Sequence, residues 1–346
     1  MAWARFSSLD GGVIEATGVE AVTSDIDDVT SGFWAVVITF EGRLTAVRMA
    51  SVDRDPSPTG VPDWTGVQGE WATSLDDTAY VAGVEEIRER IARGTVYQVN
   101  LCRVLSRAAE PRVSMRALGN LLAQGNPAPY AATIDIPEAG LEVACASPEA
   151  YLTRRGSTVT SSPIKGTAQT AENMLPKDYA ENVMIVDLVR NDLQHVCRPG
   201  TVRVDHLCRL EQHPGLVHLV SDVSGELRED ATWRELLDAS FPPGSVSGAP
   251  KHTALRAIDD LEPVPRGPYC GAVGWIDADR DEALLAVGIR TFWVDEEPSG
   301  ERVLRFGTGA GITWGSHARG EVRETELKAR RLMALARGQV AGSAGS

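Results

Sequence analysis

Two apolar segments joined by a short polar turn constrain the fold of this chain more than any other feature. Residues 269–276 and 283–294 have the composition of strands, and residues 277–281 between them are rich in aspartate, which is typical of a turn. Parallel neighbours need a crossover of about a dozen residues or more, so a turn this short can join only antiparallel strands. We therefore expect antiparallel sheet in this part of the chain.

Helices of ordinary length are expected between the strand segments. Apolar residues at helical spacing predict helices over residues 78–93, 115–123, 177–192, 233–239, 251–261 and 320–337. Short apolar runs predict further strands over residues 33–40, 96–105, 130–136, 141–146, 150–154, 202–204, 216–223 and 303–306. Helices mixed with antiparallel hairpins indicate an α+β fold rather than a parallel, doubly wound sheet.

Length and local composition indicate how the chain divides. At 346 residues the chain exceeds the usual size of one hydrophobic core. A stretch rich in Pro, Gly and Asp over residues 51–69 predicts a loop between an N-terminal strand-rich lobe, residues 1–75, and a core over residues 76–338. Residues 339–346 are small and polar, and we expect a disordered tail there.

Net charge and cysteine usage exclude several classes of partner. Asp and Glu number 48 against 34 Lys and Arg, and the net charge of −14 repels nucleic acid and anionic membrane surfaces. No stretch is apolar enough to span a bilayer, and the N-terminus lacks the apolar core of a signal peptide. The five cysteines have no zinc-binding spacing and are odd in number. These features predict a protein of the reducing cytoplasm with no nucleic acid or membrane partner.

Lysine is rare in this chain, and one lysine lies in a segment whose backbone is constrained. The lysines are Lys165, Lys177, Lys251 and Lys328, and arginine supplies the other basic residues. A buried ammonium can lose its proton and become a nucleophile, whereas a guanidinium keeps its proton. Lys165 lies between Pro163 and Gly166, which restrict the backbone around it. Lys165 is therefore the first candidate for a reactive amine.

Two expected helices each carry a pair of carboxylates on one face. Asp178 and Glu181 are three residues apart on one helix, so both project from the same side. Glu321 and Glu324 have the same spacing on the last expected helix. Carboxylates that face one another need a cation between them, and Mg2+ accepts a few carboxylates together with substrate oxygens. Two solvated acidic faces are the alternative, and the spacing alone does not exclude it.

Three features are typical of a site that binds a carboxylate. Gly248 lies where a helix is expected to open, and free N–H groups at a helix start can bind an anion. The glycine-rich segment 307–311 is expected to end a strand and to let a ligand approach the backbone. Arg290 lies within the apolar strand 283–294, where an unpaired guanidinium is costly, so we expect it to meet a carboxylate. A capped helix, a turn and a structural ion pair explain the same features.

Two further titratable residues each have two interpretations. His218 lies in an apolar strand and is either a satisfied core residue or a catalytic group. Glu149 follows Ser147 and Pro148, and it is either a buried general acid or an exposed carboxylate in a turn. Spacing does not decide between them.

Taken in order, segments from residue 94 to residue 332 resemble the chorismate-utilising enzymes, the family of anthranilate, aminodeoxychorismate, isochorismate and salicylate synthases. The matching segments are GTVYQVNL (94–101), SPEAYL (147–152), PIKGT (163–167), KDYAENVMIVDLVRNDL (177–193), VHLVS (217–221), FPPGSVSGAPK (241–251), RGPYCGAVG (266–274), AVGIRT (286–291), GAGI (309–312) and EVRETELKA (321–329). The resemblance implies an α+β fold like that of anthranilate synthase component I, with two antiparallel sheets packed face to face and helices outside. Residues 76–338 would then be the chorismate-binding catalytic core.

The resemblance also implies a role for each matching residue. Lys165 would be the nucleophile, Glu149 would protonate the departing hydroxyl group, and His218 would lie beside the reacting ring. Substrate contacts are implied for Tyr269, Arg290, Gly309, Ala310, Gly311, Lys328, Ser245 and Gly248. Mg2+ ligands are implied at Glu181, Glu321 and Glu324, assisted by Asp178.

Two positions distinguish the reactions within the family. Members that form 4-amino-4-deoxychorismate carry PIKGT, whereas other members typically have a small residue where this chain has Lys165. Isochorismate and salicylate synthases place a water-activating lysine where this chain has Gln98. The resemblance thus implies amino-group transfer to chorismate in the para-aminobenzoate and folate branch, with the anthranilate branch as the alternative.

No segment of the chain is suited to release ammonia from glutamine. None of the five cysteines has the glycine-flanked setting of a glutaminase nucleophile. The resemblance therefore implies a separate glutamine amidotransferase subunit, which would supply ammonia for reaction with chorismate.

Overall fold

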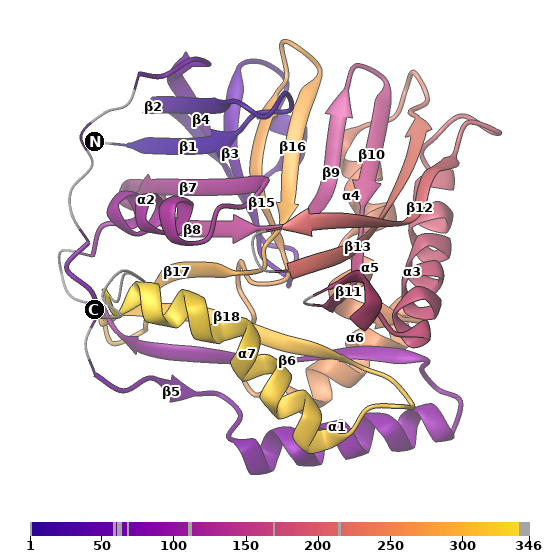
Figure 1. The fold of residues 1–346 in the computed structure, drawn as a ribbon. Helices are drawn as coiled ribbons and strands as arrows, with labels where there is room; N and C mark the ends of the chain where they lie inside the picture. Colours follow the sequence, from indigo (N-terminus) through magenta and orange to yellow (C-terminus); the bar gives the residue numbers. More distant parts are fainter. Residues whose placement is uncertain are drawn as a thin grey trace.

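The structure is a computed structural model, and it describes residues 2–57, 60, 64–67, 69–109, 113–168, 170–213 and 216–338 (Figure 1). The expected tail, residues 339–346, lies outside the described residues. Helices and antiparallel strands are mixed along the chain, which confirms the α+β class.

The secondary structure follows the expected helices closely and extends several of the strands. The strands are β1 (Trp3–Ser7), β2 (Val13–Thr23), β3 (Phe33–Ile38), β4 (Leu44–Asp53), β5 (Ala72–Thr73), β6 (Gln98–Ala108), β7 (Tyr130–Ile136), β8 (Leu141–Ser147), β9 (Ala150–Arg155), β10 (Thr158–Ser162), β11 (Ile164–Ala168), β12 (Arg203–His213), β13 (Leu216–Glu226), β14 (Gly248–Ala249), β15 (Ala272–Asp277), β16 (Glu282–Val287), β17 (Thr291–Glu296) and β18 (Arg302–Ile312). The α-helices are α1 (Asp77–Ala92), α2 (Met115–Gly125), α3 (Pro176–Gln194), α4 (Trp233–Ser240), α5 (Gly244–Ser247), α6 (Lys251–Leu261) and α7 (Ala318–Ala336).

The described strands pair antiparallel and form one hydrogen-bonded sheet with two halves. The first half runs through β12, β13, β10, β9, β16, β15, β3, β4 and β2, with β11 also paired to β13. The second half runs through β1, β7, β8, β17, β18 and β6. Pairing of β1 with β2 joins the halves, so the two sheets that the resemblance implied are continuous at one edge. In Figure 1, β15 and β16 stand upright while β7, β8 and β17 lie across the molecule.

The largest hydrophobic core lies between the two halves of the sheet. It contains side chains of β3, β15 and β16 from one half and of β7 and β8 from the other. Within it Phe33 and Trp275 stack with ring centroids 5.4 Å apart. A second cluster joins β8, β17 and β18 to α2 and α7, and a third joins β6 to α1 and α6. These helices therefore cover the outer face of the second half of the sheet.

The first strands of the chain pair with strands from its later part. Trp3 of β1 lies opposite Asp135 of β7, and Trp34 of β3 lies opposite Ile276 of β15. Side chains from both sides of the expected boundary at residue 75 contribute to the largest core. The strands β1 to β4 thus belong to the same sheet as the strands that follow them.

Side-chain caps determine where several helices begin. The Asp76 carboxylate accepts a hydrogen bond from the backbone N–H of Ala79 at the start of α1. Thr232 and Glu235 form a reciprocal capping box at the start of α4. In the described ranges, no helix is long and apolar enough to cross a membrane.

The expected strand over residues 283–294 is interrupted, and this part of the prediction was wrong. β16 ends at Val287 and β17 begins at Thr291, and Arg290 between them has a φ of 53°, in the left-handed region. Gly288 lies in this break, where a Cβ atom would come within 2.0 Å of the Pro268 carbonyl oxygen. An apolar run continues through the break, so the sequence pattern does not reveal it.

The expected turn over residues 307–311 was also wrong. These residues lie inside β18, where Gly307 to Gly311 pair with Val104 to Asn100 of β6. Glycine allows close packing here and does not end the strand. A Cβ atom at Gly307 would lie 2.0 Å from Cγ of Tyr269.

Candidate active site

Lys165 lies at an irregularity in β11. The pairing of β11 with β13 changes register between Ile164 and Thr167, and such bulges redirect the side chains they contain. The Lys165 Nζ atom donates a hydrogen bond to the carbonyl oxygen of Ser245, 2.7 Å away in α5. This contact ties the strand that carries the lysine to the short helix beside it.

The surroundings of Lys165 favour its neutral form. Burial lowers the pKa of Lys165, and the positive charge of Lys328 acts in the same direction. The carboxylates of Glu181 and Glu149 oppose this effect without reversing it. A larger fraction of neutral amine is therefore available at neutral pH than for an exposed lysine.

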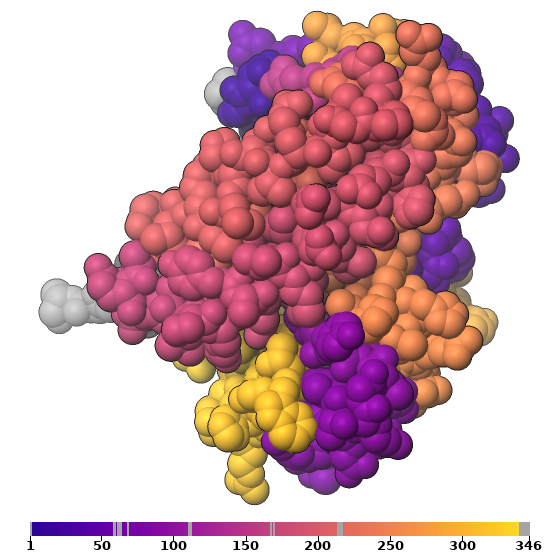
Figure 2. All heavy atoms as spheres, turned by 90° about the vertical axis from the view of Figure 1, so that its right-hand side faces the viewer, coloured from indigo at the N-terminus to yellow at the C-terminus, as the bar shows by residue number. Residues whose placement is uncertain are grey.

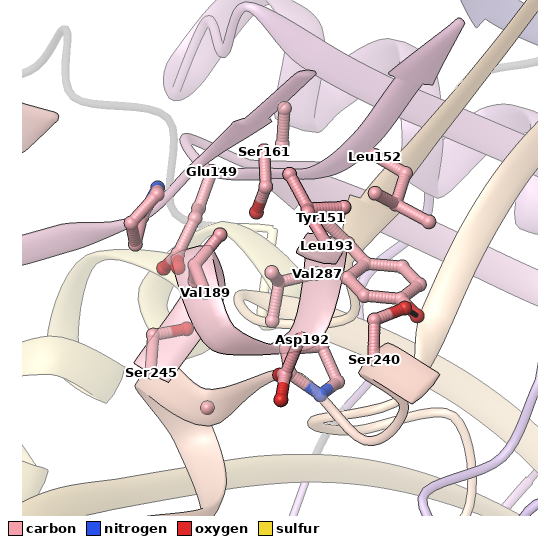
Figure 3. Close-up of a pocket in the computed structure, with 14 residues that line it drawn as sticks. Glu149, Tyr151, Leu152, Ser161, Val189, Asp192, Leu193, Ser240, Ser245 and Val287 are labelled. Carbon is pink, nitrogen blue, oxygen red and sulfur yellow. Dashed lines mark hydrogen bonds between the residues drawn. The ribbon is translucent and has the colours of Figure 1, made fainter. Parts of the chain in front are cut away.

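Glu149 is buried between β8 and β9, so the interpretation as an exposed turn residue is wrong. Glu149 is 3% exposed, and its carboxyl group points toward Ser245 (Figure 3). Burial raises the pKa of Glu149 to about 7, although hydrogen bonding by Ser245 and the nearby charge of Lys165 act to lower it. Glu149 can therefore hold and release a proton near neutral pH.

A small cavity lies beside Glu149 and is also lined by residues of β9, α3 and α4. Its volume is about 20 Å³, which is room for about one water molecule, and Ser161 and Asp192 are among the residues that line it (Figure 3). The hydroxyl groups of Tyr151 and Ser240 lie 2.5 Å apart at its edge. This cavity is too small for a ring-sized substrate.

The carboxylates of α3 and α7 form one electrostatic cluster. Burial raises the pKa of Glu181, and the negative charges of Asp178 and Glu321 add to this effect. Burial likewise raises the pKa of Glu321, and the charge of Glu324 adds to it. The two helices that carry these residues reach the same face of the molecule, with α3 above α7 in Figure 2. The structure thus brings together the two acidic pairs that the sequence placed on separate helices.

The donor chemistry of this cluster fits Mg2+, which prefers carboxylate oxygens. Within the described ranges, however, no three carboxylate, histidine or cysteine side chains lie close enough to hold a metal ion by themselves. The Asp178 carboxylate accepts a hydrogen bond from the backbone N–H of Leu175, 2.8 Å away, and so caps α3. A metal ion at this position would need ligands in addition to the protein carboxylates.

Lys328 connects α7 to the glycine-rich part of β18. Its Nζ atom donates a hydrogen bond to the Gly309 carbonyl oxygen at 3.1 Å and lies 2.8 Å from the Glu324 carboxylate. Burial acts to raise the pKa of Glu324, but Lys328, together with Lys177 and Lys165, lowers it overall. The electrostatic role of Lys177 was not foreseen, and its signal in the sequence was only that lysine is rare.

The glycines of β18 provide space next to Lys165. A Cβ atom at Gly311 would lie 2.6 Å from Nε2 of Gln98 and 3.5 Å from Nζ of Lys165. Gly309 faces Cys102, whose Sγ atom would lie 2.6 Å from a Cβ atom there. The methyl group of Ala310 belongs to the hydrophobic cluster with α1 and α6, so it points away from Lys165. Gly307 to Ala310 are buried, and Gly311, the glycine nearest to Lys165, is half-buried.

The side chain of Arg290 has no hydrogen-bond or ion-pair partner in the described part of the chain, although its carbonyl oxygen accepts a hydrogen bond from the Ala146 N–H. No described carboxylate pairs with its guanidinium group, so the structural ion pair considered from the sequence is absent there. Burial lowers the pKa of Arg290. A partly buried, unpaired guanidinium is suited to binding a carboxylate of a ligand. Tyr269, by contrast, is 5% exposed and packs its ring against Gly307.

His218 and Gly248 both lie in paired strands, β13 and β14. His218 is buried on β13, opposite Thr167 of the strand that carries Lys165. Gly248 pairs with Val99 of β6, where a Cβ atom would come within 2.2 Å of the Gln98 carbonyl oxygen. Close packing of β14 on β6 therefore accounts for glycine at position 248 without an anion.

Comparison with known proteins identifies the class to which this fold and this site belong. Residues 39–334 match the family of chorismate binding enzymes, and the chain belongs to this family. It is 36% identical over 294 residues to anthranilate synthase component 1 of Streptomyces coelicolor, covering 82% of this chain and 56% of that protein. It is 33% identical over 273 residues to aminodeoxychorismate synthase component 1 of Bacillus subtilis, covering 75% of this chain and 56% of that protein. The chain thus spans just over half the length of these curated relatives.

Solved structures support the fold. A 2,3-dihydroxybenzoate-specific isochorismate synthase from Bacillus anthracis superposes with a TM-score of 0.80 at 24% identity, covering 98% of this chain and 96% of that chain. Anthranilate synthase component I from Streptococcus pneumoniae superposes with a TM-score of 0.75 at 22% identity, covering 95% and 90%. The fold is therefore that of anthranilate synthase component I, as the resemblance implied.

Proposed function

We propose that this chain transfers an amino group to chorismate and forms 4-amino-4-deoxychorismate, as an aminodeoxychorismate synthase component I does. The observation that carries the proposal is the placement of Lys165. Its amine contacts the Ser245 carbonyl oxygen at 2.7 Å, and the Ser245 side chain hydrogen-bonds the buried Glu149. A nucleophile and a proton donor thus adjoin the same residue.

In the first step, neutral Lys165 would attack C2 of the chorismate ring. The ring double bonds shift, the C4–O bond breaks, and protonated Glu149 supplies the proton with which the hydroxyl group leaves as water. The lowered pKa of Lys165 and the raised pKa of Glu149, about 7, both favour the forms that this step requires.

In the second step, ammonia would add at C4. The double bonds shift back, the bond from C2 to Lys165 breaks, and the lysine leaves as a neutral amine. The proton released from the new ammonium group returns to the Glu149 carboxylate, so both protein groups regain their starting forms. The net reaction consumes chorismate and ammonia and yields the amino product and water.

Substrate binding is proposed at residues around this pair. The guanidinium of Arg290, which has no partner among the described side chains, and the backbone of Gly309 to Gly311 would hold a carboxylate of chorismate, and His218 would lie beside the ring. Mg2+ held by Glu181, Glu321 and Glu324 would supply positive charge for the ring carboxylate. Lys328 lies between the proposed carboxylate-binding backbone and the proposed metal ligands, because it contacts Gly309 and Glu324.

Ammonia is proposed to come from a separate glutamine amidotransferase subunit. The described cysteines Cys102, Cys145, Cys197 and Cys270 are buried, and burial raises the pKa values of the Cys102 and Cys145 thiols, which makes them poor nucleophiles. Ammonium salts should replace this partner in the test tube.

The test is a search for the covalent intermediate. When chorismate is added without ammonia, the intact mass should rise by that of chorismate less one water, and the peptide with Lys165 should carry the adduct. Lys165→Ala and Lys165→Arg should form no adduct and no product, because neither side chain provides a neutral amine. Lys251→Arg is the matched control, since Lys251 pairs with Asp192 at 2.8 Å and a guanidinium can keep that pair. Turnover by Lys165→Arg at the unaltered rate would refute covalent catalysis.

Formation of anthranilate is the second candidate, because the relatives include anthranilate synthases of similar identity. Anthranilate fluoresces as soon as it forms from chorismate and ammonium. Aminodeoxychorismate requires a separate lyase to give para-aminobenzoate. Fluorescence of anthranilate without the lyase would favour this second reaction.

A further inference from the structure

A buried ion pair lies against α5 and β6, next to the proposed catalytic residues. Arg266 is 1% exposed and precedes β15, and Glu262 follows α6. The Nε and Nη2 atoms of Arg266 donate hydrogen bonds to the two carboxylate oxygens of Glu262, at 2.8 and 2.6 Å. This two-point contact fixes the plane of the guanidinium group.

The same pair contacts three backbone groups on two other elements. Arg266 donates from Nη1 to the Val246 carbonyl oxygen in α5, at 2.9 Å, and from Nη2 to the Asn100 carbonyl oxygen in β6, at 2.7 Å. Glu262 accepts a hydrogen bond from the backbone N–H of Cys102 in β6, at 2.8 Å. One ion pair therefore joins α5 to β6.

Each backbone group that the pair holds adjoins a residue that lies next to a site lysine. Val246 follows Ser245, whose carbonyl oxygen accepts the Lys165 hydrogen bond. Asn100 lies opposite Gly311, and a Cβ atom at Gly311 would lie 3.5 Å from Nζ of Lys165.

Cys102 lies opposite Gly309, whose carbonyl oxygen accepts the Lys328 hydrogen bond at 3.1 Å. The pair therefore reaches the surroundings of both lysines through the backbone of α5 and β6.

We infer that Arg266 and Glu262 are positioning residues, which hold α5 and β6 so that Lys165 and Glu149 meet the substrate in reactive geometry. This inference rests on the proposed function. α5 spans only four residues and lacks a side-chain cap, so it depends on contacts such as that of Arg266 with Val246. A displacement of about 1 Å at a reacting group can cost about 10²-fold in rate.

The test is the variant Arg266→Lys. A lysine keeps the positive charge, but its three donors radiate from one nitrogen, so it cannot satisfy Glu262, Val246 and Asn100 together. We expect kcat to fall on the order of 10²-fold while KM for chorismate stays within about twofold, because Arg290 and the β18 backbone still bind the substrate. The rate of the Lys165 adduct in a single turnover should fall by the same factor.

Arg302→Lys is the matched control. At the start of β18, the Nη2 atom of Arg302 donates to both carboxylate oxygens of Glu142 at 2.5 Å, and among the described residues no hydrogen bond or ion pair joins Arg302 to the groups around Lys165. Its kcat should be unchanged. Should Arg266→Lys fail to fold, Glu262→Gln provides the same comparison, because it keeps an acceptor for Cys102 and removes the charge that fixes Arg266.

Amide hydrogen exchange followed by mass spectrometry supplies a readout that does not depend on the reaction. Residues 98–102 and 244–248 should exchange faster in Arg266→Lys and not in Arg302→Lys. An unchanged kcat in the folded variant, a rise in KM alone, or an equal loss of kcat in Arg302→Lys would overturn the inference. If the unaltered protein makes no product, the proposed function fails. The inference can still be tested on its own, because unchanged amide exchange of residues 98–102 and 244–248 in Arg266→Lys would overturn it.

Discussion

The replacement Glu149→Gln should change the pH dependence of stability as well as activity. The ordinary pKa of a glutamate is 4.5, and burial raises that of Glu149 to about 7 in the folded chain. Between these values the folded chain holds a proton that the unfolded chain has released. The free energy of unfolding therefore falls as pH rises, by about 1.4 kcal/mol per pH unit.

Over the window from pH 4.5 to about 7, the accumulated loss is about 3 kcal/mol, and it persists at higher pH. A glutamine at this position does not ionise, so Glu149→Gln lacks this loss. The free energy of unfolding of the variant, measured relative to that of the unaltered protein, should therefore rise by about 3 kcal/mol between pH 4.5 and pH 8. Its kcat should fall by about 10² to 10⁴, because the proton donor is gone.

Urea unfolding of both proteins at several pH values measures this difference, since all other titrating groups are common to the two chains. The exposed Glu138 offers a control, Glu138→Gln, in which no buried charge is removed. A stability difference between Glu149→Gln and the unaltered protein that is constant from pH 4.5 to pH 8 would refute the burial argument.

Two further predictions concern the ligands of the site. Glu321→Gln should raise the Mg2+ concentration required for half-maximal rate by at least about tenfold and leave the melting temperature unchanged, because the site loses one of its few charged oxygen donors. Full turnover in excess chelator would contradict a role for the metal. Arg290→Gln should raise KM for chorismate roughly 10- to 100-fold with little change in kcat, as expected for a lost charged hydrogen bond, and steady-state kinetics would reveal the opposite split if Arg290 acted on the reaction instead.

The sequence best predicted the helices and strands whose bounds follow from the spacing of their own apolar residues. α6 and β7 match their expected bounds of 251–261 and 130–136, because apolar spacing alone identifies the faces they bury. The acidic pairs on α3 and α7 were also found from spacing, although only the structure shows that they meet.

Features that depend on contacts between distant segments were not predicted. The break at Arg290 arises where Gly288 packs on the Pro268 carbonyl, and the glycines of β18 are required by Tyr269 and Gln98, which lie far away in sequence. The spacing of Glu262 and Arg266 is local, but their contacts with Val246 and Asn100 depend on the fold and were not predicted.

The glycines of β18 limit how this enzyme could be redesigned or could diverge. Gly307, Gly309 and Gly311 face one side of the strand, where a Cβ atom would come within 2.0 Å of the Tyr269 ring, 2.6 Å of Cys102 Sγ and 2.6 Å of the Gln98 side chain, respectively. Substitutions at Gly307 and Gly309 are therefore costly routes to a new substrate. We expect the less costly routes to run through β11 and α5, where Lys165 and Ser245 meet and where one altered side chain changes the chemistry without moving the sheet.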